Sequence, residues 1–418
     1  MLSIESMIEK ENIPGHWRLE SLGNICKTTS GGTPSRKVQN YYNGNIPWVK
    51  SGELDNGLIM DTEEKITESA VTNSSAKIFP KGTLLIALYG ASIGKISFLG
   101  IDAATNQAIC GIFQSPEINH KFLFYFLSYS RPNLVKQGIG GAQPNISQGI
   151  LKNLMIPLPP LAEQSQIVEK IEELFSDLDV GRRLIEAANE QLKTYRTEVL
   201  KWSFKEGSSF NNQQLVLPED WSVVELGKVC DTASGGTPDR RNKQYFMGVN
   251  KWVKSGELNS GIIIDTEEKI SDEAMRNSNA KVFPKGTLLI ALYGATVGKM
   301  AFLGTDAATN QAVCALLNTS QINSKFLYYY LILIRPRLIK ESIGGAQKNI
   351  SQGILKKLRI PLPPYNTQIE KVEYLDYTFS LCDMVESRIE SSLNQTEALK
   401  QSILKKAFEG KLVKSQTT

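Results

Sequence analysis

The chain of 418 residues carries two similar copies of one sequence, and this repeat limits the folds open to it. Trp17 and Trp48 return as Trp221 and Trp252, at an offset of 204 residues (221 − 17 = 204) that no insertion or deletion interrupts. Chance does not produce such a correspondence, so we expect two copies of one unit in the order globule, helix, globule, helix. The longest shared blocks are residues 30–34 with 234–238, 48–54 with 252–258, 79–91 with 283–295, and 145–152 with 349–356.

A long helical pattern follows each globule. Apolar or small residues recur in alternating steps of four and three, which is the heptad seam of a coiled coil. Such a seam cannot bury itself, and the connectivity leaves one arrangement, in which the second helix runs back along the first, antiparallel. The seam of the first helix is Ile167, Ile171, Leu174, Leu178, Gly181, Ile185, Ala188, Leu192, Tyr195, Val199 and Trp202; that of the second is Leu375, Thr378, Cys382, Val385, Ile389, Ser392, Thr396, Leu399 and Ile403.

The sequence therefore predicts an α+β protein with two homologous globular domains, joined by two long antiparallel helices in a pseudo-two-fold internal repeat. Within a globule, residues 46–49 and 83–89 are predicted strands, and residues 122–129 form a predicted buried helix. The predicted domains are 1–156 (first globule), 157–205 (first long helix), 206–360 (second globule) and 361–412 (second long helix).

The composition is that of an ordinary soluble protein, with 41% hydrophobic and 22% charged residues. Residues 1–10 lack the pattern of a signal peptide, and the longest apolar run, 326–334, is too short to span a membrane. Five cysteines without a Cys-x-x-Cys spacing are expected to be reduced core thiols, and we predict a cytoplasmic protein.

Several stretches imitate catalytic motifs without their essential residues. Residues 90–95 have three residues rather than four between the glycines of a P-loop-like segment, and Ile96 stands where Mg²⁺ needs a hydroxyl. Leu362, in Leu-Pro-Pro-Tyr, cannot accept a hydrogen bond from adenine as the first residue of an adenine methyltransferase loop does. Glu53 and Asp61 are interpreted as structural or solvated acids. We therefore predict no catalytic, cofactor-binding or metal-binding residue in this chain.

Basic residues gather on the globules. Residues 1–156 contain 14 Lys and Arg against 12 Asp and Glu, and residues 206–360 contain 19 against 14, whereas residues 157–205 contain 7 against 9 and residues 361–418 contain 7 against 8. A polyanion such as DNA would favour this distribution, although ordinary surface scatter explains numbers of this size equally well.

The loops of each globule carry side chains suited to DNA, because Asn and Gln can pair with adenine, Arg with guanine, and Lys or Ser with phosphate. A turn-forming role is the alternative for each polar residue, and core packing is the alternative for the two tyrosines. The predicted DNA-contacting residues are Thr33, Arg36, Lys37, Lys50, Ser51, Tyr89, Lys95, Asn106, Gln107, Gln143, Asn145 and Ser147, with their copies Thr237, Arg240, Arg241, Lys254, Ser255, Tyr293, Lys299, Asn310, Gln311, Gln347, Asn349 and Ser351.

These motifs together resemble one family. Gly-Gly-Thr-Pro at 31–34, Tyr89–Lys95, Ala104–Ala108 and Ile156–Gln164 are similar to segments of the DNA specificity (S) subunit of type I restriction-modification systems. The resemblance covers nearly the whole chain, twice. The second linker departs from the pattern at 365–368 and keeps only the glutamine, Gln368.

The resemblance implies a non-catalytic reader of DNA. It implies two target-recognition domains, each reading half of an interrupted site, and a coiled coil that sets the spacer and docks two modification subunits. Because the repeated blocks include most of the candidate reading loops, we expect the two half-sites to be alike and inverted, so that the site is near-palindromic. The modification subunits would bring S-adenosylmethionine and methylate adenine, and restriction subunits, where present, would use ATP and Mg²⁺. The alternative is a coiled-coil scaffold or adaptor without DNA specificity; steeply salt-dependent DNA binding would separate the two.

Overall fold

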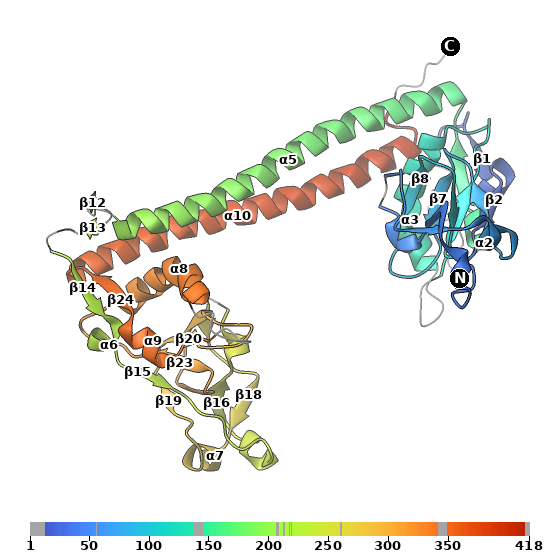
Figure 1. The fold of residues 1–418 in the computed structure, drawn as a ribbon. Helices are drawn as coiled ribbons and strands as arrows, with labels where there is room; N and C mark the ends of the chain where they lie inside the picture. Colours follow the sequence, from blue (N-terminus) through green and yellow to red (C-terminus); the bar gives the residue numbers. More distant parts are fainter. Residues whose placement is uncertain are drawn as a thin grey trace. The chain divides into compact units, whose positions relative to one another are not determined.

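The structure is a computed structural model that describes residues 13–55, 57–137, 145–205, 209–211, 214–216, 218, 220–259, 261–341 and 349–413. Contacts divide the chain into two compact units (Figure 1). Unit 1 comprises Met1–Glu186 and Glu390–Thr418, and unit 2 comprises Ala187–Ile389. Each unit thus contains one globule and one half of each long helix.

Unit 1 contains two mixed sheets and a short antiparallel strand pair, β1 (Arg18–Ser21) with β11 (Met155–Leu158). The five-stranded sheet has the order β2 (Thr28–Ser30), β10 (Ile109–Ile112), β7 (Leu84–Ala87), β8 (Ile96–Leu99), β4 (Leu58–Ile59). The four-stranded sheet has the order β5 (Glu64–Ile66), β3 (Tyr42–Val49), β9 (Ala103–Thr105), β6 (Ile78–Phe79). The helices are α1 (Leu22–Ile25), α2 (Glu68–Thr72), α3 (His120–Gln137) and α4 (Gln148–Lys152), with 3₁₀ turns η3 (Gln39–Tyr41) and η4 (Ser51–Glu53).

Unit 2 repeats this architecture. Its sheets are β14 (Ser222–Glu225) with β24 (Arg359–Leu362); β15 (Thr232–Ser234), β23 (Val313–Leu316), β20 (Leu288–Ala291), β21 (Met300–Leu303), β17 (Ile262–Ile263); and β18 (Glu268–Ile270), β16 (Asn250–Val253), β22 (Ala307–Thr309), β19 (Val282–Phe283). Its helices are α6 (Leu226–Val229), α7 (Asp272–Arg276), α8 (Ser324–Glu341) and α9 (Gln352–Lys357), with η5 (Lys243–Phe246), η6 (Ser255–Glu257) and a hairpin, β12 (Ser209–Asn211) and β13 (Gln214–Val216).

The central strand of each globule separates two cores. In β7, Leu84 and Ile86 point into one core, and Leu85 and Ala87 into another, because successive strand residues face opposite sides. The first core contains α3, which lies beside β7 and β8 in Figure 1, and the start of the first long helix. The second core lies between the two sheets. The predicted strands and the predicted buried helix are therefore confirmed, and the globule has three layers.

The two long helices are α5 (Leu161–Lys205) and α10 (Tyr365–Phe408), close to their predicted bounds. They run antiparallel in each unit, because residue numbers that increase along α5 pair with residue numbers that decrease along α10. In unit 1, Asp179 accepts a hydrogen bond from Lys400 (2.7 Å), and Arg182 lies 3.9 Å from Glu397. The predicted antiparallel pairing is confirmed within each unit.

One interhelical ion pair occurs twice, at positions that the repeat relates. Lys400 binds Asp179 in unit 1 and lies 5.4 Å from the ring centre of Phe175. In unit 2, Arg196 binds Asp383 (2.5 Å), and its guanidinium carbon lies 5.8 Å from the ring of Phe379. Partly exposed ion pairs contribute only about 0.2–1 kcal/mol each, so we assign them to register more than to stability.

The predicted heptad seam is correct at most positions of both helices and wrong at five of them. Tyr195 and Trp202 are 51% and 49% exposed, and Val385 and Leu399 are 47% and 51% exposed. Ala188 is exposed as well. A helix with 3.6 residues per turn drifts by about 20° per heptad against a strict 3.5-residue repeat, so the contact face moves on by one position. The buried side of α5 in unit 2 is Val199, Leu200, Ser203 and Phe204.

A buried glutamine ties each globule to its long helix. Gln164 is fully buried; its side-chain amide donates to the Pro159 carbonyl (2.8 Å), and its oxygen accepts from the Asn119 amide (2.7 Å). Gln368 makes the same contacts in unit 2, with Pro363 (3.0 Å) and Asn323 (2.8 Å). The one residue that the second linker keeps is thus the residue that fixes the junction.

We expect Gln164→Leu to lower the free energy of unfolding of unit 1 by about 1–3 kcal/mol, because it leaves a buried backbone N–H and a buried carbonyl without partners. Gln166→Leu, two residues along at an exposed position, is the matched control and should cost little. Denaturant unfolding of the two variants makes the comparison. Equal stability of the two variants would show that the junction does not depend on this amide.

All five cysteines are free and buried, as predicted. Burial raises the pKa of the Cys110 thiol to about 11. Among the described residues, no helix combines the length and the apolar character that crossing a membrane requires.

Candidate nucleic-acid interface

Two parallel strands bring four of the predicted residues together. β3 and β9 are hydrogen-bonded neighbours that end at Val49 and Thr105. Lys50 and Ser51 follow β3, and Asn106 and Gln107 follow β9. The Asn106 amide donates to the Val49 carbonyl (2.9 Å). The carboxyl ends of neighbouring parallel strands thus place a lysine, a serine and two amides at one edge.

The Gly-Gly pair brings the loop after β2 to the same edge. Gly32 donates its N–H to the Thr105 carbonyl (2.9 Å), and the Trp48 indole N–H donates to the Gly32 carbonyl (3.1 Å). A Cβ at Gly31 would lie 2.0 Å from the Thr105 hydroxyl oxygen, so only glycine allows this approach. Thr33, Arg36 and Lys37 lie in the loop that follows this anchored glycine pair.

A third group of loops joins the edge beside β7. Leu88 donates its N–H to Ala108 (2.7 Å), and Ile146 donates to Leu88 (2.7 Å). Tyr89 forms a β-bridge with Asn145 and is half-buried against the core. Lys95 closes the turn that follows, in which Gly90 and Gly94 have φ values of +86° and +71°. We call the residues 31–37, 50–51, 89–95, 106–107 and 145–147 the loop edge of unit 1.

Unit 2 builds the same loop edge from residues 235–241, 254–255, 293–299, 310–311 and 349–351. Asn310 donates its N–H to Val253 (2.9 Å), Tyr293 bridges to Asn349, and the Thr237 hydroxyl donates to the Gln311 side chain. Lys299 closes the turn that matches that of Lys95. Gln143 and Gln347, two of the predicted contacts, lie outside the described residues.

Some predicted residues also have local structural roles. The Ser147 and Ser351 hydroxyls cap short helices by accepting from the amides of Ile150 (3.1 Å) and Ile354 (3.2 Å). Ser51 and Ser255 begin the turns η4 and η6. The structural role expected for Glu53 is confirmed, since it accepts from the Lys50 amide (2.6 Å). Arg241 is 91% exposed and pairs with Asp239 two residues before it (2.7 Å).

Arg36 and Lys50 are bound to carboxylates. The Arg36 guanidinium donates twice to Glu64 (2.7 and 3.2 Å), and the Lys50 ammonium contacts Glu63 (2.7 Å) and Glu64 (3.1 Å). The hydrogen bonds from Arg36 hold the pKa of the Glu64 carboxyl below its ordinary value. The sequence indicated the two cations and gave no sign of their partners, Glu63 and Glu64, which lie where β5 begins.

The model of the type I restriction modification DNA specificity domain matches residues 14–190 and again residues 218–395. The chain belongs to this family.

Relatives in the specificity family extend over most of the chain. One is the Type I restriction enzyme MjaIX specificity subunit of Methanocaldococcus jannaschii, 27% identical over 77% of this chain and 76% of the relative. A chain solved in a study of complex assembly and conformational transition of the type I R-M system shares the fold, with a TM-score of 0.79, 24% identity, and coverage of 96% of this chain and 99% of that one. The HsdS subunit of Thermoanaerobacter tengcongensis also shares it, with a TM-score of 0.60, 23% identity, and coverage of 98% and 100%.

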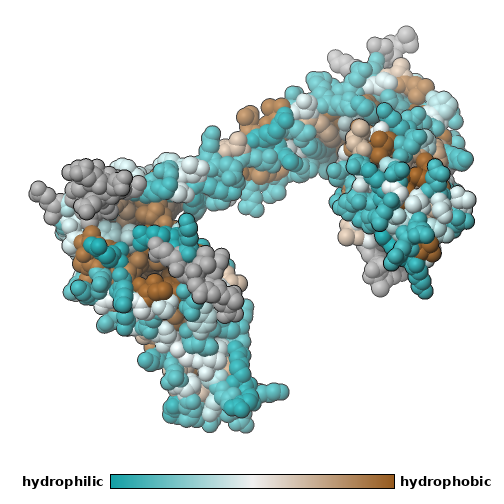
Figure 2. Space-filling model, in the orientation of Figure 1, coloured by the Kyte–Doolittle hydropathy of each residue, from teal (hydrophilic) through white to brown (hydrophobic). Residues whose placement is uncertain are grey.

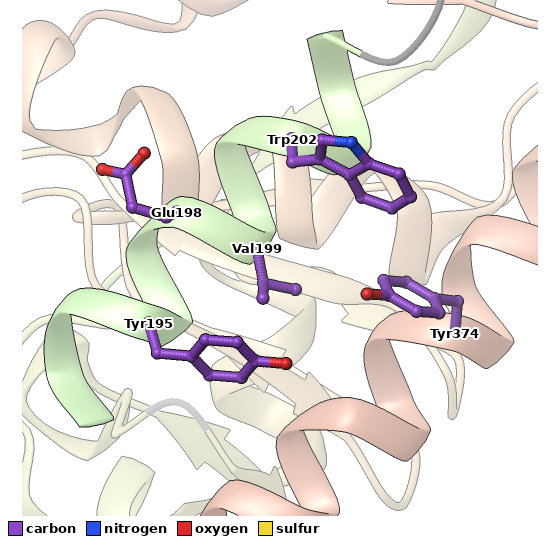
Figure 3. A pocket seen from close by; sticks show the side chains of 5 residues that line it. All are labelled: Tyr195, Glu198, Val199, Trp202 and Tyr374. Carbon is purple, nitrogen blue, oxygen red and sulfur yellow. The ribbon is translucent and has the colours of Figure 1, made fainter. Parts of the chain in front are cut away.

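This specificity-family chain has a second feature in unit 2, an apolar groove of about 280 Å³ between α5 and α10. Figure 3 shows the rings of Tyr195 and Trp202 projecting from α5 toward α10, where Tyr374 points back at them, with Val199 between. The Trp202 and Tyr374 ring centres are 5.6 Å apart. Apolar patches also interrupt the hydrophilic surface of the helices in Figure 2.

The groove continues along α10 as an exposed apolar stripe. Tyr374, Tyr377, Leu381 and Met384 follow one another in steps of three and four, and they are 42%, 66%, 43% and 63% exposed. Sequence reasoning missed this surface because it assigned Tyr195 and Trp202 to the buried seam. The second heptad stripe on α10 was the signal that could have revealed it.

The matching positions of unit 1 have different chemistry. Lys170 stands in place of Tyr374, Leu399 in place of Tyr195, and Lys406 in place of Trp202. Lys170 is paired with Glu173 (2.8 Å). The aromatic groove of unit 2 is therefore not repeated in unit 1, where lysines stand at two of the three aromatic positions.

Proposed function

We propose that this chain is the non-catalytic DNA-recognition subunit of a type I restriction-modification complex, with one loop edge for each half of an interrupted site. The observation that carries the proposal is the loop edge itself, built twice in one chain from the same residue types. Asn, Gln, Arg and Lys on loops are the side chains that read base edges and bind phosphates. Since the two edges are alike, the two half-sites should be alike and inverted.

The proposed partners follow from the family. Two modification subunits would bind the helix pair, bring S-adenosylmethionine and methylate adenine in the sites that this chain selects. Restriction subunits, where the system has them, would use ATP and Mg²⁺. DNA, nucleotides and these partners meet in the cytoplasm, which we propose as the location. The helices α5 and α10 would set the unspecified spacer between the half-sites.

The decisive experiment expresses the chain together with its modification partner in cells and maps methylated adenines across the genome. We expect a two-part motif with similar, inverted halves and a fixed unspecified spacer. Two unrelated half-sites would contradict the likeness of the loop edges. Methylation that persists unchanged without this chain would overturn the proposed function. The purified chain alone should transfer no label from S-adenosylmethionine to DNA.

We further propose that a modification subunit docks on the groove of unit 2, because the groove is an exposed aromatic surface on the helix pair. Trp202→Ala should weaken binding of that subunit by about 2 kcal/mol, roughly thirtyfold, because buried aromatic anchors dominate interfaces. Lys193→Ala, at an exposed position of α5 outside the groove lining, is the control and should change affinity little. Titration of the full chain with purified modification subunit measures both. An equal effect of the two variants would place the docking surface elsewhere.

A further inference from the structure

Each unit contains one cluster of ion pairs beside its loop edge. The cluster of unit 1 is Arg36, Lys50, Glu63 and Glu64, and that of unit 2 is Arg240, Lys254, Glu267 and Glu268. In unit 2, Arg240 donates to Glu268 (2.6 and 3.4 Å), and Lys254 contacts Glu267 (2.8 Å) and Glu268 (3.0 Å). The same four partners thus meet twice, at nearly the same distances.

The arginine of each cluster also stacks on two rings. The Arg36 guanidinium carbon lies 4.4 Å from the ring centre of Tyr42 and 5.3 Å from that of Trp48. Arg240 lies 4.5 Å from Phe246 and 5.1 Å from Trp252. A guanidinium with one edge on a carboxylate and its face on aromatic rings is fixed in orientation and has few donors left for another ligand.

The cluster joins three segments that carry the loop edge. Arg36 belongs to the loop after β2, Lys50 follows β3, and Glu64 begins β5. In unit 1 the Tyr42 hydroxyl gives further support by donating to the Pro34 carbonyl (2.7 Å). Phe246 replaces this tyrosine in unit 2, so the loop there loses that hydrogen bond and keeps the ion pairs.

The charges of the cluster cancel, with two cations against two carboxylates. Glu64 is 30% exposed and Lys50 is 29% exposed, so a DNA phosphate that reached the lysine would also approach Glu64. Repulsion from that carboxylate opposes such a contact. Lys37, the next residue after Arg36, is exposed and lies outside the cluster.

We propose that Arg36 and Lys50, with Arg240 and Lys254, are positioning residues that hold the loop edge through the glutamates and do not bind DNA themselves. This inference rests on the proposed function and narrows the predicted contacts. If Arg36 positions the loop, the Glu64 carboxylate is needed for DNA recognition although its charge repels DNA, so removing it should weaken recognition. If Arg36 binds DNA itself, removing Glu64 should free the arginine and strengthen DNA binding.

The test uses the full chain with its modification subunits, a duplex carrying the site mapped by methylation, and an unrelated duplex of equal length. If the cluster positions the loop, Glu64→Gln and Arg36→Gln should both lower the preference for the mapped site, by roughly tenfold, which is the scale of one misread base pair. The slope of log Kd against log salt should stay unchanged. Asp61→Asn, which changes an exposed acid three residues before Glu64, is the control and should keep the preference.

Two results would overturn the inference. One is tighter DNA binding by Glu64→Gln combined with a salt slope that falls by about one in Arg36→Gln, since a lost phosphate contact has that signature. The other is an unchanged preference in both variants. Lys37→Ala shows what the loss of a phosphate contact looks like in this loop. The exposed Lys37 ammonium is the cation of the loop that we expect to contribute to the slope of log Kd against log salt.

Unit 2 supplies an internal control. Glu268→Gln should relax the reading of only the half-site that unit 2 contacts. This variant should therefore bind a duplex in which that half-site is altered about as well as it binds the intact duplex. It should still reject a duplex in which both half-sites are altered. The effect should exceed that of Glu64→Gln, because the tyrosine hydroxyl is missing in unit 2. Tyr42→Phe should make the first cluster as sensitive as the second.

Failure of the proposed function is distinguishable from failure of this inference. If the wild-type complex shows no preference for any mapped site, the proposed function fails. The cluster is then judged by thermal unfolding of the Arg36→Gln, Glu64→Gln and double variants. We expect each to melt about 2–4 °C lower and the double variant to melt no lower than the worse single variant. Additive losses would overturn the inference.

Discussion

Trp48→Ala should cost unit 1 about 3–5 kcal/mol of its free energy of unfolding, a large part of the about 5–15 kcal/mol that stabilises a typical domain. Trp48 is 2% exposed and packs against Tyr42, with ring centres 6.0 Å apart. Its indole N–H also holds the Gly32 carbonyl (3.1 Å), so the substitution opens a cavity and releases the loop after β2. We expect the variant to lose reading of one half-site.

Calorimetry of the full chain makes this measurement, because the two compact units allow their unfolding transitions to be compared. Trp252→Ala, which removes the indole bound to Gly236 (3.0 Å), should destabilise unit 2 in the same way. Trp202→Ala removes a half-exposed tryptophan from α5 and is the control, with a small expected cost. An equal effect of Trp48→Ala and Trp202→Ala would contradict the role given to the buried indole.

Adding seven residues to both long helices should change the spacer of the recognised site by roughly three base pairs, since one heptad extends a helix by about 10.5 Å and base pairs are 3.4 Å apart. The insertions belong after Ala188 and after Ser392, which the repeat relates. The half-site sequences should stay the same, because no loop edge changes. Mapping of methylated adenines in cells that carry the double insertion gives the new spacer.

An insertion in only one helix is the control for the proposal that the two helices set the spacer length. It shifts α5 against α10 and separates Lys400 from Asp179 or Arg196 from Asp383, so it should cost stability without giving a clean new spacer. A double insertion that methylates at the original spacing would show that the helices do not set the distance. Altered half-site bases would show that they influence reading.

The fold was predictable because the repeat and the helical pattern are properties of the sequence alone. The bounds of α5 and α10, the strand β7, the helix α3 and the antiparallel pairing follow from residue spacing and connectivity. The exposure of Ala188, Tyr195 and Trp202 was not predictable from the heptad rule, because it depends on how far the helices supercoil.

The candidate site was predictable in its residue types and not in its bonding. The glycines at 31 and 32, with Asn106 and Gln107, indicated a loop surface, and the structure brings these loops to one edge. The Arg36–Glu64 pair joins residues 28 positions apart, through a strand register that no local pattern encodes. The aromatic groove was hidden for a similar reason, because exposure of Tyr374 depends on which face of α10 the other helix covers.

The groove gives unit 2 an aromatic surface on its helices that the matching positions of unit 1 lack, so the two halves of this repeat protein differ. If modification subunits dock on the helix pair, one meets tyrosines and a tryptophan, and the other meets Lys170, Lys406 and Leu399. Two attachment points of unlike chemistry should differ in affinity, so the tighter one is occupied first as the concentration of the modification subunit rises. A complex with one modification subunit should therefore accumulate when that subunit is scarce. The ratio in which a cell makes the two proteins would then decide how much of the DNA reader is fully loaded, and two unlike sites would hold more of it in the half-loaded form than two equal sites would.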